Sequence, residues 1–326
     1  MTGALPSPTA PLLIGLDLGG SKIEAAALRR ADSGSLEIAV RKRIPTERDR
    51  GYEAVLDRTA SLLREVMLEV GADPREAPIG VGMPGGVTRA GLIKNSNTVC
   101  LNGRPFRDDL CRELGRSIAF ENDANCFALA EARMGAGAAF SRGVVFGVIL
   151  GTGAGGGVVL GGTVWAGPHG IAGEWGHHAV WPDRGPVCYC GRRGCLEVFA
   201  SGPAVERDYR ERSGKPLPLA EIARRREEDP HAQGAIEGLL ETFGRGLANV
   251  IDILDPSAIV IGGGVSNLDI LYTEGAARVA RCVFNDELTT PILKNALGDS
   301  SGVLGAALLN EPAAGEFLVS GSFAAR

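Results

Sequence analysis

Four side chains that could bind a soft metal ion lie in one short segment of the chain. They are His177, Cys188, Cys190 and Cys195. One imidazole and three thiolates match the number and softness of ligands in a closed, tetrahedral structural zinc site. Gly191 and Gly194 would let the loop turn back tightly enough for the three sulfurs to meet one ion. Three unrelated thiols and a surface histidine are the simpler alternative, which the clustering disfavours. The segment therefore predicts a structural Zn²⁺ in a loop over residues 174–197.

The cysteine count and the start of the chain bear on the redox compartment. The chain has seven cysteines, an odd number, and it begins MTGALPSPTAPLL, with no basic segment followed by a long apolar one. Disulfides are typical of exported proteins. We therefore expect reduced or metal-bound thiols and a cytoplasmic location.

Asp123 is a candidate general base. In the segment FENDANCFALAEARMG, Asn122 and Asp123 stand directly before an Ala/Leu-rich pattern that predicts a helix reaching Met134. Either residue could simply be the helix N-cap, which is the commonest reason for these residue types at this place. Phosphoryl transfer to a hydroxyl, in turn, requires one carboxylate within hydrogen-bond reach of the acceptor. Both interpretations remain open at this point.

A repeat indicates how these residues are positioned. Residues 12–28 (LLIGLDLGGSKIEAAAL) align without a gap on residues 144–160 (VVFGVILGTGAGGGVVL), at a spacing of 132 residues. Each copy reads as an apolar strand, a glycine turn and a second apolar strand. A third apolar run, residues 258–261, ends in Gly262, Gly263 and Gly264. We expect two similar lobes, with bare backbone N–H groups at the strand ends and a nucleotide cleft between the lobes.

Other readings of the glycine-rich segments fail on their context. Residues 151–156 (GTGAGG) match the dinucleotide-binding fingerprint, but that motif requires a helix directly afterwards and VVLGGTVW is β-branched and broken by glycine. No glycine-rich stretch ends in the Gly-Lys-Ser/Thr of a P-loop. Residues 143–173 carry no charged side chain, yet their glycines and β-branched runs predict a hairpin rather than a membrane span. The net charge of −5, with both signs interspersed, predicts neither a nucleic-acid nor a membrane partner.

Five motifs together resemble the ROK family of sugar kinases. They are LDLGGSK at 16–22, ENDAN at 121–125, LGTGAGGG at 150–157, GEWGH at 173–177 and CYCGRRGCLE at 188–197. The resemblance implies an α/β class with a duplicated actin-like (ribonuclease-H-like), two-lobed ATPase fold. We expect an N-terminal lobe over 1–121, with a C-terminal helix at about 302–326 packing back on it, and a C-terminal lobe over 122–301 that carries the zinc loop 174–197. ATP, Mg²⁺ and a hexose are the implied small-molecule partners, and a homodimer is the implied assembly.

The resemblance also implies residue roles. The first phosphate turn would be Gly19, Gly20, Ser21 and Lys22, with Asp17 on the magnesium side. The second would be Gly151, Thr152, Gly153 and Gly155, with Gly263 and Gly264 near adenosine. The sugar would be held by Asn97, Asn122, Asp123, Glu174, His177 and Glu197, with Asp123 as the catalytic base. His177 is expected to bind zinc through one ring nitrogen and to leave the other for a sugar hydroxyl.

Three segments suggest a branch of the family. IPTERD at 44–49, KNSNTVCLNG at 94–103 and HGIAGEWGH at 169–177 resemble bacterial fructokinases or mannokinases. We therefore expect ATP-dependent phosphorylation of D-fructose at the 6-hydroxyl, with the acetamido group of N-acetylglucosamine not accommodated. The alternatives are another hexose, namely mannose, glucose or an N-acetylhexosamine, or a non-catalytic member. A family repressor would need an N-terminal helix-turn-helix, for which eleven residues before the first strand are too few. An inactive sugar sensor would not need intact phosphate turns and Asp123.

Overall fold

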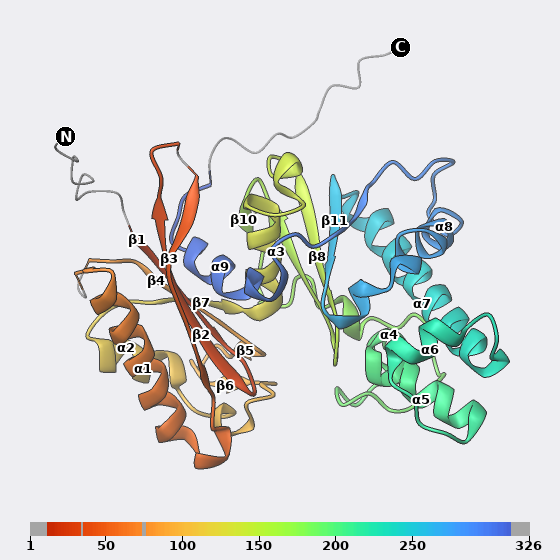
Figure 1. The fold of residues 1–326 in the computed structure, drawn as a ribbon, viewed down its shortest axis with the longest axis horizontal. Helices are drawn as coiled ribbons and strands as arrows, with labels where there is room; N and C mark the ends of the chain where they lie inside the picture. The colour runs from red at the N-terminus through yellow and green to blue at the C-terminus, as the bar shows by residue number, and fades with distance from the viewer. Residues whose placement is uncertain (1–11, 34, 74–75, 314–326) are drawn as a thin grey trace, which may run out of the picture. The chain divides into compact units, whose positions relative to one another are not determined.

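The computed structural model describes residues 12–33, 35–73 and 76–313, which form two compact units. The first unit comprises residues 12–130 together with Asp299–Pro312, and the second comprises Glu131–Gly298 together with Ala313. Each unit is built on one five-stranded sheet (Figure 1). The chain therefore leaves the first unit after Ala130 and returns to it at Asp299, near its end.

The repeat predicted from the sequence is present in both sheets. Strands β1 (Leu12–Leu18) and β2 (Lys22–Arg30) form an antiparallel hairpin, as do β8 (Val144–Leu150) and β9 (Ala154–Leu160). The starts of equivalent strands keep the predicted spacing of 132 residues. The charge-free stretch 143–173 thus begins as a hairpin in the second sheet, as expected. Among the described residues, no helix has the length and apolar character needed to cross a membrane.

The two sheets also share their topology. The strand orders are β3-β2-β1-β4-β7 and β10-β9-β8-β11-β12. In each sheet the first three strands are antiparallel and the next two join in parallel. The remaining strands of these sheets are β3 (Leu36–Pro45), β4 (Ile79–Met83), β7 (Ala119–Asn122), β10 (Thr163–Val164), β11 (Ala258–Gly262) and β12 (Ile292–Lys294). A short separate pair is formed by β5 (Gly86–Val87) and β6 (Ile93–Lys94).

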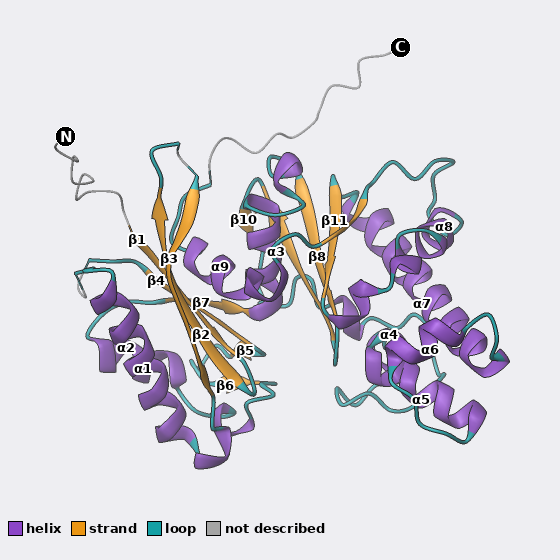
Figure 2. Ribbon diagram, in the orientation of Figure 1, coloured by secondary structure: helices purple, strands orange, loops and turns teal. Residues whose placement is uncertain are grey.

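Helices cover both faces of the first sheet. Helices α1 (Tyr52–Glu69) and α2 (Phe106–Leu114) lie together on one face, and α9 (Ser301–Leu308) lies on the other (Figures 1 and 2). Glycines allow α9 to approach the strands closely. A Cβ atom at Gly15 would lie 2.1 Å from the carbonyl oxygen of Val303, and one at Gly80 would lie 1.9 Å from that of Ala306. The contact between α9 and the sheet is therefore made backbone to backbone.

The second unit is organised around one long helix. Helix α7 (Pro230–Leu254) begins at Asp229, whose side chain accepts hydrogen bonds from the N–H groups of His231 and Ala232. Its apolar residues join those of β8, β9 and β11 in one core. The other helices of the second unit are α4 (Glu197–Ala200), α5 (Gly202–Ser213), α6 (Leu219–Arg225) and α8 (Glu274–Ala280).

The units divide within α3 (Asp123–Arg133) rather than after residue 121. The first part of α3 belongs to the first unit because it packs against α9, where a Cβ atom at Gly305 would lie 1.7 Å from the carbonyl oxygen of Cys126. The second unit begins at Glu131 because the buried Glu131 carboxylate accepts hydrogen bonds from the N–H groups of Ala136, Ala296 and Leu297. The helix expected at about 302–326 is α9, and residues 314–326 lie outside the described residues.

We expect Gly305→Ala to lower the thermal unfolding midpoint by several degrees. The added methyl group collides with backbone, and overpacking of this kind costs about 1–3 kcal/mol. Gly238→Ala is the matched control, because Gly238 also lies in a helix but the nearest atom to an added Cβ is 3.8 Å away. The control should be neutral or stabilising by about 0.5–1 kcal/mol. Equal midpoints for the two variants, measured by circular dichroism, would contradict the packing described here.

Candidate active site and metal centre

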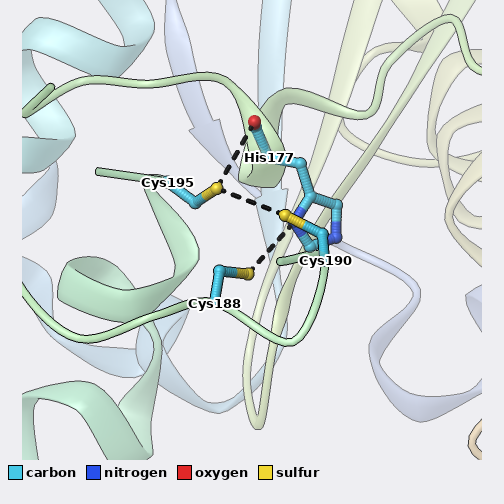
Figure 3. A group of neighbouring side chains, drawn as sticks. All are labelled: His177, Cys188, Cys190 and Cys195. Atoms are coloured by element: carbon cyan, nitrogen blue, oxygen red, sulfur yellow. Dashed lines mark hydrogen bonds between the residues drawn. The ribbon is translucent and has the colours of Figure 1, made fainter. Parts of the chain in front are cut away.

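The four predicted zinc ligands come together in the second unit. The ligand atoms of His177, Cys188, Cys190 and Cys195 all lie within 4.8 Å of one another (Figure 3). The Nδ1 atom of His177 is 3.6 Å from the Sγ atom of Cys188, and the Sγ atoms of Cys190 and Cys195 are also 3.6 Å apart. A tetrahedral zinc with metal–sulfur bonds of about 2.3 Å separates its sulfurs by roughly 3.7 Å. The donor set and its spacing therefore fit one zinc ion.

Backbone contacts hold this loop against the second sheet. A short 3-10 turn, η4 (Trp175–His177), packs on β9 so closely that a Cβ atom at Gly176 would lie 2.0 Å from the carbonyl oxygen of Ala154. The indole N–H of Trp175 donates a hydrogen bond of 2.7 Å to the carbonyl oxygen of Gly155. Gly194 has a φ of 80°, in the left-handed region, which is the role that the sequence predicted for the loop glycines. The sheet thus fixes the position of His177.

The thiols differ in their readiness to ionise. Burial raises the pKa of Cys195 to about 12. Burial also favours the neutral thiol of Cys190, but hydrogen bonds with Arg192, Cys195 and Cys188 together outweigh burial and lower the pKa of Cys190 to about 6. Because a metal binds thiolates, Cys190 offers a charged ligand at neutral pH.

The first glycine turn is tightly closed in the first unit. The N–H of Gly19 donates to the carbonyl oxygen of Lys22 at 2.9 Å, and the hydroxyl of Thr46 donates to the carbonyl oxygen of Gly19 at 2.7 Å. Lys22 lies 3.8 Å from Asp299 in a solvent-exposed ion pair. The turn therefore brings Gly19, Gly20, Ser21 and Lys22 together at the end of β1, as predicted.

Carboxylates crowd beside this turn. Burial, then the charge of Asp123, then that of Glu24, raises the pKa of Asp17 to about 7. Glu24 is buried and is paired with Arg41 and Arg43, at 2.5 Å in each case. A hard cation with oxygen ligands would relieve the repulsion at Asp17, so Asp17 fits the magnesium position that the resemblance implied.

Helix α3 begins at the candidate base. The Oδ1 atoms of Asn122 and Asp123 both accept a hydrogen bond of 2.9 Å from the N–H of Ala124. The side-chain N–H of Asn122 donates to the carbonyl oxygen of Gly85 at 2.9 Å. The capping role left open by the sequence is therefore filled by Asn122, which is the residue before the helix. Asp123 is close enough to influence the pKa of Asp17.

Asn97 lies beside the first glycine turn. A Cβ atom at Gly20 would be 3.1 Å from the Asn97 Oδ1 atom and 3.3 Å from a guanidinium nitrogen of Arg48. Arg48 also donates a hydrogen bond of 3.2 Å to the backbone carbonyl oxygen of Asn97. Arg48 therefore adds a positive charge at the turn. Arg48 belongs to the segment IPTERD, in which nothing but its positive charge signals this role.

The second glycine turn is joined to the end of the metal loop. The N–H of Gly151 donates to the carbonyl oxygen of Gly153 at 2.9 Å, and the N–H of Ala154 donates to the carboxylate of Glu197 at 2.9 Å. A Cβ atom at Gly151 would lie 3.8 Å from the backbone nitrogen of Gly264. The second unit thus brings together two of the predicted nucleotide segments, which are the turn that begins at Gly151 and the glycines after β11.

Tyr189 is a neighbour of the predicted sugar ligands in the second unit, and the sequence did not predict it. Partial burial, then the charges of Glu197 and Glu174, raises the pKa of Tyr189 to about 12. The Tyr189 hydroxyl lies 2.8 Å from the Nε2 atom of His177, and the two rings meet edge to face with centroids 5.0 Å apart. The ring nitrogen that was expected to be free for a sugar is therefore hydrogen-bonded. Tyr189 stands between two predicted metal ligands, Cys188 and Cys190, and that position was the one available signal in the sequence.

We expect Cys190→Ser to lose the bound metal and to lower the unfolding temperature, because the energy of structural metal binding is also energy of local folding. Metal analysis of purified protein should find one zinc per chain in the wild type and almost none in the variant. Cys282→Ser is the control, since Cys282 is exposed and lies outside the cluster. A wild type without zinc, or a variant with a full complement, would refute the assignment.

Comparisons with known proteins agree with the family predicted from the motifs. The profile of the ROK family matches residues 13–312. The N-acetyl-D-glucosamine kinase of Mannheimia succiniciproducens is 37% identical over 314 residues, covering 91% of this chain and 99% of the relative. The crystal structure of the ROK hexokinase from Thermus thermophilus is 35% identical, with a TM-score of 0.81 over 91% of this chain and 97% of that one.

A further solved structure is a ROK family glucokinase from Streptomyces griseus in complex with glucose and AMPPNP. It is 29% identical, with a TM-score of 0.72 over 91% of this chain and 98% of that one. The curated relative is an N-acetyl-D-glucosamine kinase, so the comparisons do not support the fructokinase branch predicted from three segments. Both the profile match and the relatives extend over nearly the whole chain. The chain therefore belongs to the ROK family, as an ATP-dependent sugar kinase with the two-lobed, actin-like fold.

Proposed function

We propose that this kinase transfers the γ-phosphoryl group of ATP to the 6-hydroxyl of N-acetyl-D-glucosamine. The observation that carries the proposal is the 37% identity to an N-acetyl-D-glucosamine kinase over 91% of the chain. An N-acetylhexosamine was among the sugars left open by the sequence. The hexokinase and glucokinase structures make glucose the second candidate.

Asp123 is proposed as the general base. Its carboxylate would take the proton of the 6-hydroxyl as the sugar oxygen attacks the γ-phosphorus. The new O–P bond forms while the bond between the γ-phosphorus and the β–γ bridging oxygen breaks, and ADP leaves with that oxygen. The place of Asp123 at the start of α3, close enough for its charge to act on Asp17, supports this role.

Two backbone turns are proposed to hold the triphosphate. Their members are Gly19, Gly20, Ser21, Lys22, Gly151, Thr152, Gly153 and Gly155. Bare N–H groups suit phosphate oxygens, and Lys22 and Arg48 add positive charge. Asp17 would hold magnesium, which supplies charge neutralisation when bound. Gly263 and Gly264 are proposed to contact the adenosine.

The remaining proposed roles concern the sugar. Its hydroxyls would be bound by Asn97, Asn122, Glu174, His177 and Glu197. Carboxylates form charge-assisted hydrogen bonds with hydroxyls, so the two glutamates would fix the ring orientation. The zinc loop would keep His177 and Glu197 in place, since both lie at or next to ligand positions.

Among N-acetylglucosamine, glucose, mannose and fructose, N-acetylglucosamine should have the highest kcat/KM, by roughly tenfold or more. A pocket whose polar groups hydrogen-bond to an acetamido group leaves those groups without partners when another hexose binds. Each hydrogen bond lost in this way costs about 1–3 kcal/mol. Steady-state assays of ADP release over the panel test this. A higher kcat/KM for glucose would select the second candidate, and one for fructose would restore the branch first predicted.

Asp123→Asn should lower kcat by about 10²-fold or more while sugar affinity changes far less, because the amide keeps the shape but accepts no proton. Asp57→Asn is a matched control, since Asp57 is an exposed residue of α1. Turnover of the Asp123 variant near the wild-type rate would reduce Asp123 to a structural role at the start of α3.

A further inference from the structure

The two ring nitrogens of His177 face different neighbours. Nδ1 lies 3.6 Å from the Cys188 sulfur, on the side of the metal ligands, whereas Nε2 lies 2.8 Å from the Tyr189 hydroxyl. A metal held by the three thiolates would therefore bind Nδ1. A neutral imidazole that binds metal through Nδ1 carries its proton on Nε2. His177 then has one N–H group, which it donates to the oxygen of Tyr189.

That N–H is also the group proposed to bind the sugar. One N–H makes one strong, well-aligned hydrogen bond. A phenol oxygen and a sugar hydroxyl oxygen offer the same kind of acceptor. Both cannot use Nε2 at full strength, so either Tyr189 leaves when the sugar binds or the sugar does not bond to His177.

Tyr189 is placed so that its side chain can move. It is 71% exposed, so rotation of the ring uncovers little apolar surface. Its backbone is held on both sides, because it lies between the ligands Cys188 and Cys190. The Tyr189 side chain could therefore rotate without displacing the backbone of the loop 174–197.

We propose that the Tyr189 hydroxyl and a sugar hydroxyl compete for the Nε2 N–H of His177, so that Tyr189 is a positioning residue that limits sugar affinity. The inference rests on the proposed role of His177 in the sugar site. Tyr189 already occupies the atom at issue, since its hydroxyl lies 2.8 Å from the Nε2 atom. Its hydroxyl acts as an internal competitor.

The test is Tyr189→Phe, which removes the hydroxyl and keeps the ring. Sugar affinity, measured by calorimetry with the hexose that the wild type phosphorylates best, should rise by about two- to tenfold, which is the range for one hydrogen bond. The KM for that sugar should fall with little change in kcat or in the KM for ATP. Zinc content should match the wild type.

One control variant and a measurement of zinc release separate competition for the N–H from support of the metal site. Tyr209→Phe also removes a tyrosine hydroxyl from the second unit, one that bonds to Asp229 at 2.8 Å, and it should leave the sugar KM unchanged. If Tyr189 instead supports His177 as a zinc ligand, Tyr189→Phe would release zinc faster and raise the sugar KM. A sugar affinity of the Tyr189 variant that is unchanged or weaker overturns the inference. A wild type that phosphorylates none of the hexoses would instead count against the proposed function.

Discussion

Cys195 and Glu197 are separated by one residue, and this spacing couples the metal loop to the second glycine turn. Cys195 is a predicted zinc ligand, and the carboxylate of Glu197 accepts the N–H of Ala154, directly after the turn. On the other side of the loop, η4 is packed against the same strand through Gly176. The loop is thus fixed to β9 at both of its ends. A metal ion that closes the loop would therefore also order the backbone around the proposed phosphate site.

Much of the fold could be predicted because short segments of the sequence determine its strands and turns. The hairpins β1–β2 and β8–β9 follow from apolar runs interrupted by glycine, and their common spacing identified the duplication. The gathering of His177, Cys188, Cys190 and Cys195 could also be predicted, because these donor types are rare and three of the four lie close in sequence. The boundary between the two units could not be predicted, because it depends on contacts between residues that are distant in sequence. Glu131 reads as a helix residue, yet its carboxylate is bonded to the N–H groups of Ala296 and Leu297.

The comparisons do not support the fructose prediction, and the structure shows why one of its segments was a poor guide. The segment 44–49 suggested a fructokinase, but Thr46 and Arg48 lie at the first glycine turn, where Thr46 hydrogen-bonds to both Ser21 and Gly19. If that turn holds phosphate, as proposed, the residues that build it carry little information about the sugar, because ATP is the phosphate donor whichever sugar is used. The hydrogen bond between Tyr189 and His177 could not be predicted from the sequence either, because a single tyrosine between two cysteines does not reveal which way its ring points.

Helix α9 has a consequence for the order in which the protein is made. Its residues, Ser301–Leu308, cover a sheet whose strands all precede residue 123. A ribosome synthesises Glu131–Gly298, the main segment of the second unit, before α9 appears. Gly15 and Gly80 expose bare backbone where α9 docks, so the part of the sheet around them has no side chain of its own to cover it. The second unit can therefore complete its core during synthesis, whereas this part of the first sheet stays uncovered until translation is nearly finished.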